Sequence, residues 1–297
     1  MIKFNIKAAN IEPISLFGLR LNTFSDRDVV ALIADAIDRG HHYVLGNHNS
    51  HSLYLWNREP QLRDFHAIAD YVLIDGMSLI LLGRLTGLPL RREHRATSLD
   101  FMPLLLPEAA KEKWRIYYLG GRPGVAKRAA VKLLAQYPGI CLRTHHGYFD
   151  AAKSSEENRR VLDDINAYAP DILLVGMGMP RQEIWILENR SELTANIISP
   201  CGAHIDYIAG EIPTAPRYLA AIYLEWLYRL IAEPRRLWRR YLIEPWFMAG
   251  LVAHLWTGKA LLHSEEIQND KARNLAHSQE VVRESMSSNG LNERGGD

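Results

Sequence analysis

The chain has 297 residues, of which 47% are hydrophobic and 23% are charged, and its 35 Lys and Arg against 34 Asp and Glu leave a formal net charge of +1. This is the composition of a globular protein with a core large enough for one or two domains, and the charge balance argues against a whole-molecule nucleic-acid footprint. Two cysteines, Cys141 and Cys201, exclude a disulfide scaffold and a cysteine-only zinc site and point to a reducing compartment.

The sequence carries no strong signal for export or for a membrane span. The N-terminal residues lack the long apolar stretch of a secretory signal. The longest nearly apolar run, 247–262, is interrupted by His254 and Lys259. A spanning helix needs about 20 apolar residues, so we expect none here.

Short apolar strands alternate with helical segments along the first two thirds of the chain. Ser25 and Asp28 form a capping box, which predicts a helix start. Apolar residues then recur at helical spacing, namely Val29, Leu32, Ile33, Ala36 and Ile37. We predict strands over 43–45, 71–74, 115–119, 172–175 and 196–199. Strands separated by helices predict an α/β fold with a mostly parallel sheet covered by helices on both faces.

The character of the sequence changes near Pro213. The segment 215–242 contains six Arg against two Glu and is rich in Tyr and Trp, and Pro234 should divide it into two helices. Beyond Leu262 the chain is polar. We therefore predict an α/β core over 1–212, a basic and aromatic helical appendage over 213–262, and a disordered tail over 263–297.

Three interpretations of the appendage remain open. Amphipathic helices with basic flanks and aromatic anchors lie in the headgroup region of membranes, and each Arg near anionic lipid contributes about 1 kcal/mol. A helical packing domain with a solvated basic face would have a similar sequence. Nucleic-acid binding is the third possibility, but the basic segment is short and the rest of the chain is not basic.

Four polar or glycine-rich loops follow the predicted strands, at 47–50, 75–78, 120–124 and 176–182. Ligands of parallel α/β sheets bind outside the carboxyl ends of the strands. The shared position of the loops therefore predicts a single binding site at that edge.

Two of these loops have the composition of phosphate-binding turns. Gly120 and Gly121 lie between a strand and a helix, where a phosphate can approach backbone N–H groups. In the second loop Arg181 suits a phosphate and Gln182 a sugar or base. The first loop matches neither a Walker motif nor the dinucleotide fingerprint. On pattern alone, both loops are equally consistent with tight strand-to-helix turns.

Asp75 directly follows the predicted strand over 71–74. A carboxylate there can serve as a general base once burial adjusts its pKa. The same position suits an N-cap for the next helix, and the pattern by itself favours the cap.

Two motifs resemble metal sites but fit other roles better. Asp26-Arg27-Asp28 has the Asp-x-Asp spacing of metal-dependent nucleotide-sugar enzymes, yet it falls in a first helical turn, where acids offset the helix dipole. His48 and His51 lack an acid or Cys at metal-binding spacing. We therefore predict no metal site.

Several longer segments, in order along the chain, resemble the WecG/TagA/CpsF family of bacterial glycosyltransferases. They are Tyr118-Leu-Gly-Gly-Arg-Pro-Gly-Val-Ala126, His146-Gly-Tyr-Phe149, Pro170-Asp-Ile-Leu-Leu-Val-Gly-Met-Gly-Met-Pro-Arg-Gln-Glu-Ile-Trp185 and Glu225-Trp-Leu-Tyr-Arg-Leu-Ile-Ala-Glu-Pro-Arg-Arg-Leu-Trp238. The resemblance extends from about residue 14 to about residue 245.

The resemblance implies a Rossmann-like core and a reaction. A sugar would pass from a UDP-sugar to an undecaprenyl-diphosphate-linked sugar, with inversion to a β-linkage and without a metal or cofactor. The reaction would take place at the cytoplasmic face of the inner membrane, where the C-terminal helices would dock peripherally. The resemblance is also compatible with a homo-oligomer. Products of the family feed teichoic acid linkage units, enterobacterial common antigen or exopolysaccharides.

The resemblance also implies roles for particular residues. Asp75 matches the catalytic base that would deprotonate the acceptor hydroxyl. Arg95 matches an arginine that meets the diphosphate, Gln182 a residue near the donor, and Asp206 an acid near the nucleotide. Together with the glycines of the loop over 120–124, the expected substrate-binding residues are Asn47, Asn49, Arg95, Gly120, Gly121, Gln182, Asp206, Arg229, Arg236 and Arg239. The last three arginines would neutralise the lipid diphosphate or the leaving UDP, and Tyr148 or Phe149 is a candidate to stack on uracil.

The chain departs from the family at one position of the sugar pocket. The family commonly has Thr two residues before the asparagine, where this chain has Asn47. The donor sugar therefore stays open between N-acetylmannosamine, glucose as in xanthan-type enzymes, and another hexose. A non-catalytic, membrane-associated nucleotide-binding regulator is the alternative function, and an NAD-dependent oxidoreductase lacks its fingerprint.

Overall fold

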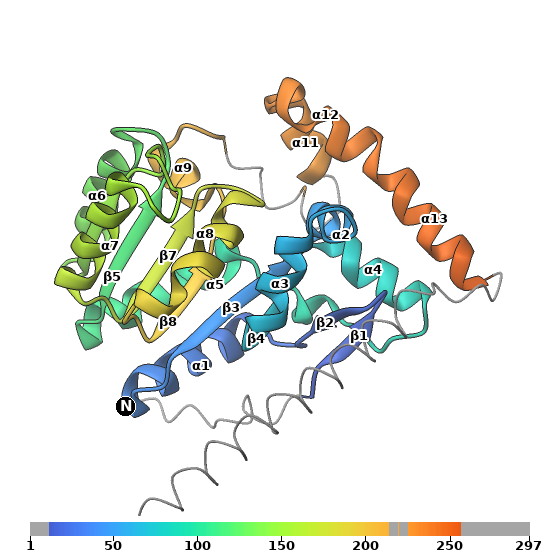
Figure 1. Ribbon diagram of the computed structural model, residues 1–297. Coiled ribbons are helices and arrows are strands. Elements are labelled where there is room, and N and C mark those ends of the chain that lie inside the picture. The colour runs from blue at the N-terminus through green and yellow to red at the C-terminus, as the bar shows by residue number, and fades with distance from the viewer. Residues whose placement is uncertain (1–11, 214–218, 220–224, 257–297) are drawn as a thin grey trace, which may run out of the picture. The chain divides into compact units, whose positions relative to one another are not determined.

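The computed structural model describes residues 12–213, residue 219 and residues 225–256 (Figure 1). The expected tail over 263–297 lies outside these residues. The chain divides into two units between Gly250 and Leu251. Of the second unit, the structure describes only the end of the last helix, up to Trp256.

The centre of the first unit is a parallel sheet of six strands in the order β4-β3-β8-β7-β5-β6. Its strands are β3 (Tyr43–His48), β4 (Tyr71–Ile74), β5 (Arg115–Gly120), β6 (Cys141–His145), β7 (Ile172–Gly176) and β8 (Ile197–Pro200). The predicted α/β class and mostly parallel sheet are confirmed. Five of the strands were predicted, and β6 was not. A separate antiparallel hairpin, β1 (Ile14–Leu16) with β2 (Leu19–Leu21), precedes the sheet.

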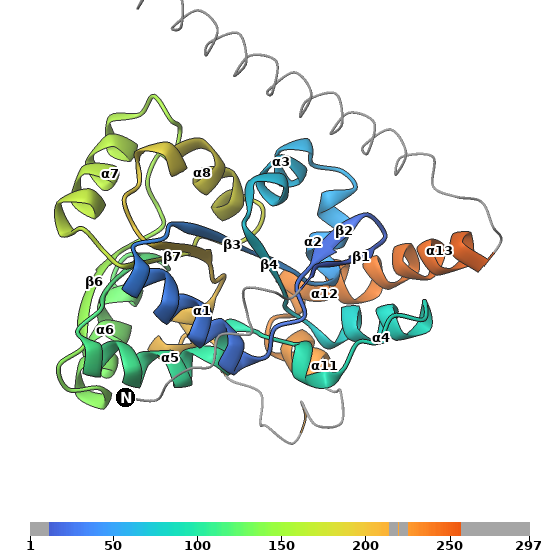
Figure 2. The same ribbon diagram turned by 90° about the horizontal axis from the view of Figure 1, so that it is seen from below.

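Helices cover both faces of the sheet, as the sequence predicted. Figure 2 shows α3, α7 and α8 on one face and α1, α5 and α6 on the other. The helices of the core are α1 (Asp26–Arg39), α2 (Ser50–Trp56), α3 (Pro60–Ile68), α4 (Met77–Leu85), α5 (Ser98–Glu112), α6 (Val125–Gln136), α7 (Glu156–Tyr168), α8 (Arg181–Asn189) and α9 (His204–Ala209), with short 3-10 turns η2 (Arg92–His94) and η3 (Arg190–Glu192).

Local sequence signals explain where these elements begin. The predicted capping box at Ser25 is present: its hydroxyl accepts from Asp28 N, and the Asp28 carboxylate accepts from Ser25 N at 2.9 Å. Every residue of β7 is buried, as expected for a strand with helices on both sides. Full burial of one Leu or Ile contributes about 1.5–3 kcal/mol, so the central strands anchor the fold.

Three further helices follow the core: α11 (Glu225–Ala232), α12 (Pro234–Leu242) and α13 (Glu244–Trp256). Pro234 occupies the first turn of α12, and it separates α11 from α12 as predicted. Among the described residues, no helix is both long enough and apolar enough to span a bilayer.

Candidate active site

The predicted base, Asp75, lies directly beyond β4 and is held by the neighbouring loop. Its backbone N–H donates to His48 O at 2.7 Å, and its carboxylate accepts from Asn49 Nδ2 at 3.2 Å. Asn49 is itself fixed as the N-cap of α2, where its Oδ1 accepts from Ser52 N at 3.0 Å. The two residues that the sequence proposed from separate loops therefore meet.

The strand end also brings Arg95 to this place. Ala96 N donates to Ile74 O at 3.0 Å, which continues the edge of the sheet beside β4 and sets Arg95 next to the end of that strand. The Arg95 guanidinium donates to Asp100 Oδ2 at 2.6 Å. Thr97 donates to the same oxygen at 2.8 Å, so Asp100 orients the arginine from behind.

Opposing effects set the pKa of Asp75. Burial is the largest effect and raises it above the usual carboxyl range. The hydrogen bond from Asn49 and the positive charges of Arg229, Arg240 and Arg95 act the other way. A carboxylate made more basic by burial, beside cations that favour its ionised form, is suited to act as a general base.

A buried pair of imidazoles packs next to the loop that carries Asn47 and Asn49. The rings of His48 and His66 stack at a centroid distance of 3.7 Å. His48 Nδ1 lies 2.8 Å from Ser52 Oγ, and His66 Nε2 lies 3.3 Å from Asn47 O. Burial lowers the pKa of both histidines, that of His66 to about 4, so they are neutral groups that fix the loop. His48 is thus a buried residue that supports the loop.

Two side-chain amides connect neighbouring loops at the carboxyl ends of the parallel strands. Asn47 Nδ2 donates to Pro200 O at 3.3 Å, from β3 across to β8, while its buried Oδ1 has no hydrogen-bond partner among the residues that the structure describes. Gln182 is fully buried, and its Oε1 accepts from Gly178 N at 3.1 Å and Gly202 N at 3.2 Å. Gln182 thus joins the loops after β7 and β8, and its contact with a donor stays a prediction.

Glu183, next to Gln182, is a buried acid that the sequence analysis did not single out. Its Oε1 accepts from Gln182 Nε2 at 2.7 Å, and its buried Oε2 has no hydrogen-bond partner in the described part of the chain. Burial raises the pKa of Glu183 to about 7, so the side chain is partly protonated at neutral pH.

The glycine turn after β5 is as tight as the sequence suggested. Gly120 lies so close to Gly176 that a Cβ would approach the Gly176 oxygen to 2.4 Å. Gly121 has a φ of +71°, and its carbonyl accepts from Gly147 N at 2.9 Å. Side chains are therefore excluded from the point where the ends of β5 and β7 meet the 146–149 loop.

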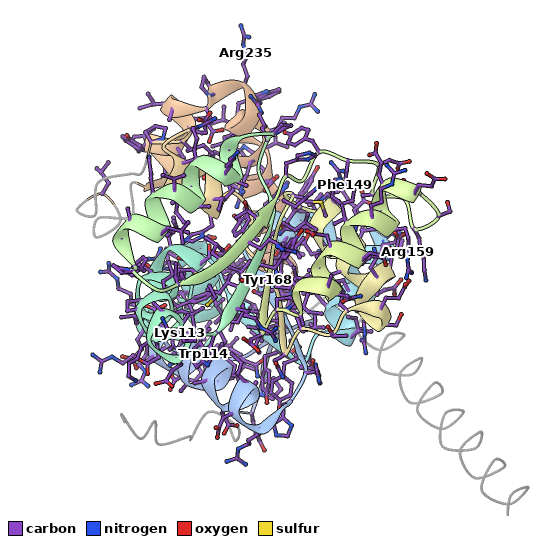
Figure 3. All side chains as sticks on the ribbon, turned by 90° about the vertical axis from the view of Figure 1, so that its left-hand side faces the viewer. Lys113, Trp114, Phe149, Arg159, Tyr168 and Arg235 are labelled. Atoms are coloured by element: carbon purple, nitrogen blue, oxygen red, sulfur yellow. The ribbon has the colours of Figure 1, made fainter. Side chains whose placement is uncertain are left out.

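The aromatic residues of that loop occupy the same edge. Figure 3 shows Phe149 at the end of the molecule opposite Lys113 and Trp114, which precede β5. Arg181 Nη2 donates to Phe149 O at 2.6 Å and fixes the loop. Tyr148 is 58% exposed and hydrogen-bonds to Arg122, so it presents a free ring face beside the glycine turn.

Asp206 lies in the first turn of α9, beside the glycine turn. Tyr118 organises this helix start, because its hydroxyl accepts from Ile205 N at 3.1 Å and from Cys201 Sγ at 3.2 Å. Burial raises the pKa of Cys201 to about 12, so this thiol is a structural group. Asp206 and Arg122 are close enough to influence each other electrostatically.

The appendage contributes cations, although not the full predicted set. Arg229 lies 5.6 Å from the centroid of the Tyr207 ring and influences Asp75. Arg240, which the sequence analysis did not select, also influences Asp75. Arg239 is exposed and lies over Trp238, and the side chain of Arg236 is outside the described part of α12. The sequence spacing of the arginines in the appendage does not show which of them lies near the Asp75 carboxylate.

Helix α2 also contacts the first turn of α13. His51 Nδ1 lies 2.7 Å from Glu244 Oε1, and the Tyr54 and Phe247 rings meet edge to face at 5.5 Å. The Arg58 guanidinium lies 3.8 Å from the Tyr54 ring centroid and 5.3 Å from that of Phe247. We call these five residues the α2–α13 contact. The helix that Asn49 caps therefore also holds the appendage.

The Asp26-Arg27-Asp28 motif takes the structural role that was predicted. Both acids lie in the first turn of α1, and Asp28 completes the capping box. Burial, and then Asp100, raise the pKa of Asp26 to about 6. In the part of the chain that the structure describes, no group of three or more His, Cys, Asp or Glu side chains is arranged to hold a metal ion.

Fold and site together define a parallel α/β protein with a polar site at the carboxyl edge of its sheet, next to a glycine turn suited to a phosphate group. The Glycosyl transferase WecG/TagA/CpsF family matches residues 14–261, so the chain belongs to this family and is a glycosyltransferase.

Similar proteins include two N-acetylglucosaminyldiphosphoundecaprenol N-acetyl-beta-D-mannosaminyltransferases. The one from Bacillus spizizenii is 29% identical over 197 residues, which cover 66% of this chain and 74% of the relative. The one from Staphylococcus aureus is 26% identical over 203 residues, which cover 65% of this chain and 77% of the relative.

Proposed function

We propose that the chain transfers a hexose or N-acetylhexosamine from a UDP-sugar to an undecaprenyl-diphosphate-linked sugar, with inversion to a β-linkage, at the cytoplasmic membrane surface. The observation that carries the proposal is Asp75, a carboxylate with raised pKa that Asn49 holds and that three arginines influence. The names of the two relatives support an acceptor of this chemical class.

In the proposed reaction Asp75 takes the proton of an acceptor hydroxyl. The acceptor oxygen attacks the anomeric carbon from the face opposite the nucleotide, forming the new glycosidic bond as the bond to the UDP oxygen breaks. Negative charge develops on the leaving diphosphate, and arginines are the side chains best suited to bind it. Arg95, Arg229 and Arg240 lie where their charge already reaches Asp75.

The donor nucleotide would lie along the glycine turn. This turn leads from β5 into α6, and a diphosphate can approach backbone N–H groups at such a helix start. Asp206 would bind the nucleoside, and Tyr148 would offer a ring face to the base. Asn47 and Gln182 would border the sugar, between the glycine turn and Asp75.

A panel of donors and acceptors tests the proposal. UDP-glucose, UDP-N-acetylglucosamine and UDP-N-acetylmannosamine would each be offered with short-chain diphospholipid glucose or N-acetylglucosamine, with and without EDTA. We expect transfer from one pair that survives EDTA. Tight UDP binding with no transfer from any pair would contradict the proposal and favour a non-catalytic nucleotide-binding protein. Loss of activity in EDTA that a divalent metal restores would contradict a metal-independent reaction.

We also propose that the appendage docks on the membrane. In α11–α13 seven large apolar side chains are exposed, namely Trp226, Leu227, Ile231, Trp238, Leu242, Ile243 and Trp246. Exposed aromatic and aliphatic side chains beside arginines are typical of helices that lie in the headgroup region.

A further inference from the structure

Helix α4 of the core carries two exposed apolar side chains on one face. Leu81 and Leu85, one turn apart, are 42% and 61% exposed. The opposite face of the helix is buried through Leu79, Ile80 and Leu82. The burial pattern thus divides α4 into one buried face and one exposed apolar face.

The helix also differs from others in its direction. Helices α6 and α8 pack on strands of the sheet, whereas the main neighbour of α4 is the short turn η2. Figures 1 and 2 both show α4 continuing beyond the end of β4 instead of returning over the sheet. Helix α4 therefore lies at the edge of the sheet where β4 ends at Asp75.

The segment that follows α4 is basic. Arg84 in the last turn of α4 is exposed, and so are Arg91 and Arg92 after it, against one exposed acid of this segment, Glu93, which pairs with Arg91 at 2.9 Å. Arg84 Nε donates to Leu90 O at 2.7 Å, which ties the segment back to the helix. A Cβ at Gly83 would lie 2.4 Å from the Leu90 side chain, so helix and segment pack closely.

We propose that α4 and this basic segment form a membrane-contacting surface of the core, with Leu81 and Leu85 entering the interfacial layer and Arg84, Arg91 and Arg92 binding anionic headgroups. Exposed leucines beside arginines match the apolar and anionic layers of such a surface. The proposal rests on the proposed lipid-linked acceptor. Because α4 begins two residues after Asp75, its contact would hold the base at the depth where a lipid diphosphate lies.

Co-sedimentation of the full chain with vesicles tests this surface. The vesicles would contain phosphatidylcholine alone or with 30% phosphatidylglycerol, a share of about one third as in common anionic test membranes. Leu81→Glu/Leu85→Glu should lower partitioning to the mixed vesicles at least about tenfold. The matched control is Val131→Glu/Leu134→Glu on α6, where the two side chains are 64% and 48% exposed. This control should partition like the wild-type chain.

A second variant tests the contribution of the arginine charges to vesicle binding and guards against a folding defect in the leucine variant. Arg91→Gln/Arg92→Gln should lower partitioning to the anionic vesicles, by about fivefold for each arginine, and leave the weak binding to phosphatidylcholine unchanged. Equal partitioning of the wild-type chain and both α4 variants would overturn the proposal. So would a concentration-dependent dimer that the leucine variant dissolves while vesicle binding persists, since the face would then serve a second copy of the chain.

Transfer to a short-chain acceptor distinguishes this proposal from the proposed function. Such an acceptor does not require vesicles, so both α4 variants should retain the wild-type rate with it. Absence of transfer by the wild-type chain from every donor would contradict the proposed function, while the partitioning data would still report on α4.

Discussion

In the core, the largest apolar side chains are hidden: Trp185 is 1% exposed and Phe65 is fully buried. In the C-terminal helices, Ile231 and Trp246 are 73% and 79% exposed. Both regions are rich in apolar residues, but the core covers its largest ones with its own elements, whereas several large ones in the described part of the appendage are exposed. Burial of apolar side chains therefore stabilises the core, whereas the exposed apolar side chains of the appendage are suited to contact a surface outside the chain.

The two regions also use charge differently. Several surface charges of the core pair with each other, as Arg159 does with Glu192 at 2.6 Å, and such exposed pairs contribute little to stability. In the appendage, Arg229 and Arg240 act on Asp75 of the core. The chemistry that we propose therefore depends on both regions, and the following predictions separate their contributions.

Among the variants that separate the two regions, the largest effect is expected from removing the appendage charges that reach Asp75. We expect Arg229→Gln/Arg240→Gln to lower sugar transfer by about a hundredfold or more, because charge on the leaving diphosphate loses its partners. The two arginines lower the pKa of Asp75, so their removal raises it. The acidic limb of the pH dependence of kcat/KM should then move to higher pH.

Arg235→Gln is the matched control, since this α12 side chain is exposed and Figure 3 shows it pointing outward. An unchanged acidic limb in the double variant, or an equal loss in the control, would contradict a direct effect of Arg229 and Arg240 on the base.

A smaller effect should follow from weakening the α2–α13 contact. Glu244→Ala/Phe247→Ala removes the partners of His51 and Tyr54. We expect transfer to a short-chain acceptor to fall by about tenfold through misplacement of the appendage arginines, while UDP affinity stays unchanged. Trp246→Ala, on the exposed face of the same helix, should leave this rate unchanged and weaken vesicle binding instead. The reverse pattern would show that the contact does not position the site.

Two glycines with similar backbone angles give a test of the nucleotide site. Gly121 and Gly87 have φ values of +71° and +84°. Either change to Ala should cost about 1 kcal/mol of stability through backbone strain. At Gly121 the new Cβ would also lie 3.0 Å from the Ile205 side chain, whereas at Gly87 it would meet nothing within 4 Å. Only Gly121→Ala should weaken UDP binding, by several fold in calorimetry. Equal UDP affinity in both variants would place the nucleotide elsewhere.

The smallest expected effect concerns stability and pH. Glu183 has a folded-state pKa of about 7 against an ordinary value of 4.5, so the folded chain binds the additional proton between these values. Its contribution to stability is fully present below pH 4.5 and is lost as pH rises through 7, at about 1.4 kcal/mol per pKa unit. Glu183→Gln should flatten this decline in urea unfolding between pH 5 and pH 8. A variant that keeps the wild-type slope would show that Glu183 titrates normally.

The sequence was most informative where a strand runs through the interior. Strands β4 and β7 were predicted to the residue or nearly so, because continuous apolar runs end at Asp75 and Gly176. Strand β6 was missed, because Cys141–His145 lies at the edge of the sheet, is only partly buried and has no apolar run. Helix α5 was not predicted either, and it contains Pro103 and Pro107.

The site was predictable in part, for a related reason. Ligands of parallel sheets bind beyond the carboxyl ends of the strands, and this rule places Asp75, Asn49 and the glycine turn at one edge of the sheet. The resemblance adds roles for them. Side-chain partners depend on packing between distant segments. This is why Gln182, expected near the donor, joins two loops, and why Arg240 was missed.

The most direct test of the central claim is the turnover of Asp75→Asn beside that of the wild-type chain and of Asp163→Asn, an exposed acid on α7. The account predicts that Asp75→Asn loses about a hundredfold to ten-thousandfold in transfer, as expected for removal of a general base, with UDP affinity unchanged. Asp163→Asn should behave like the wild-type chain. Near-normal transfer by Asp75→Asn would show that this carboxylate is not the base and would contradict the account.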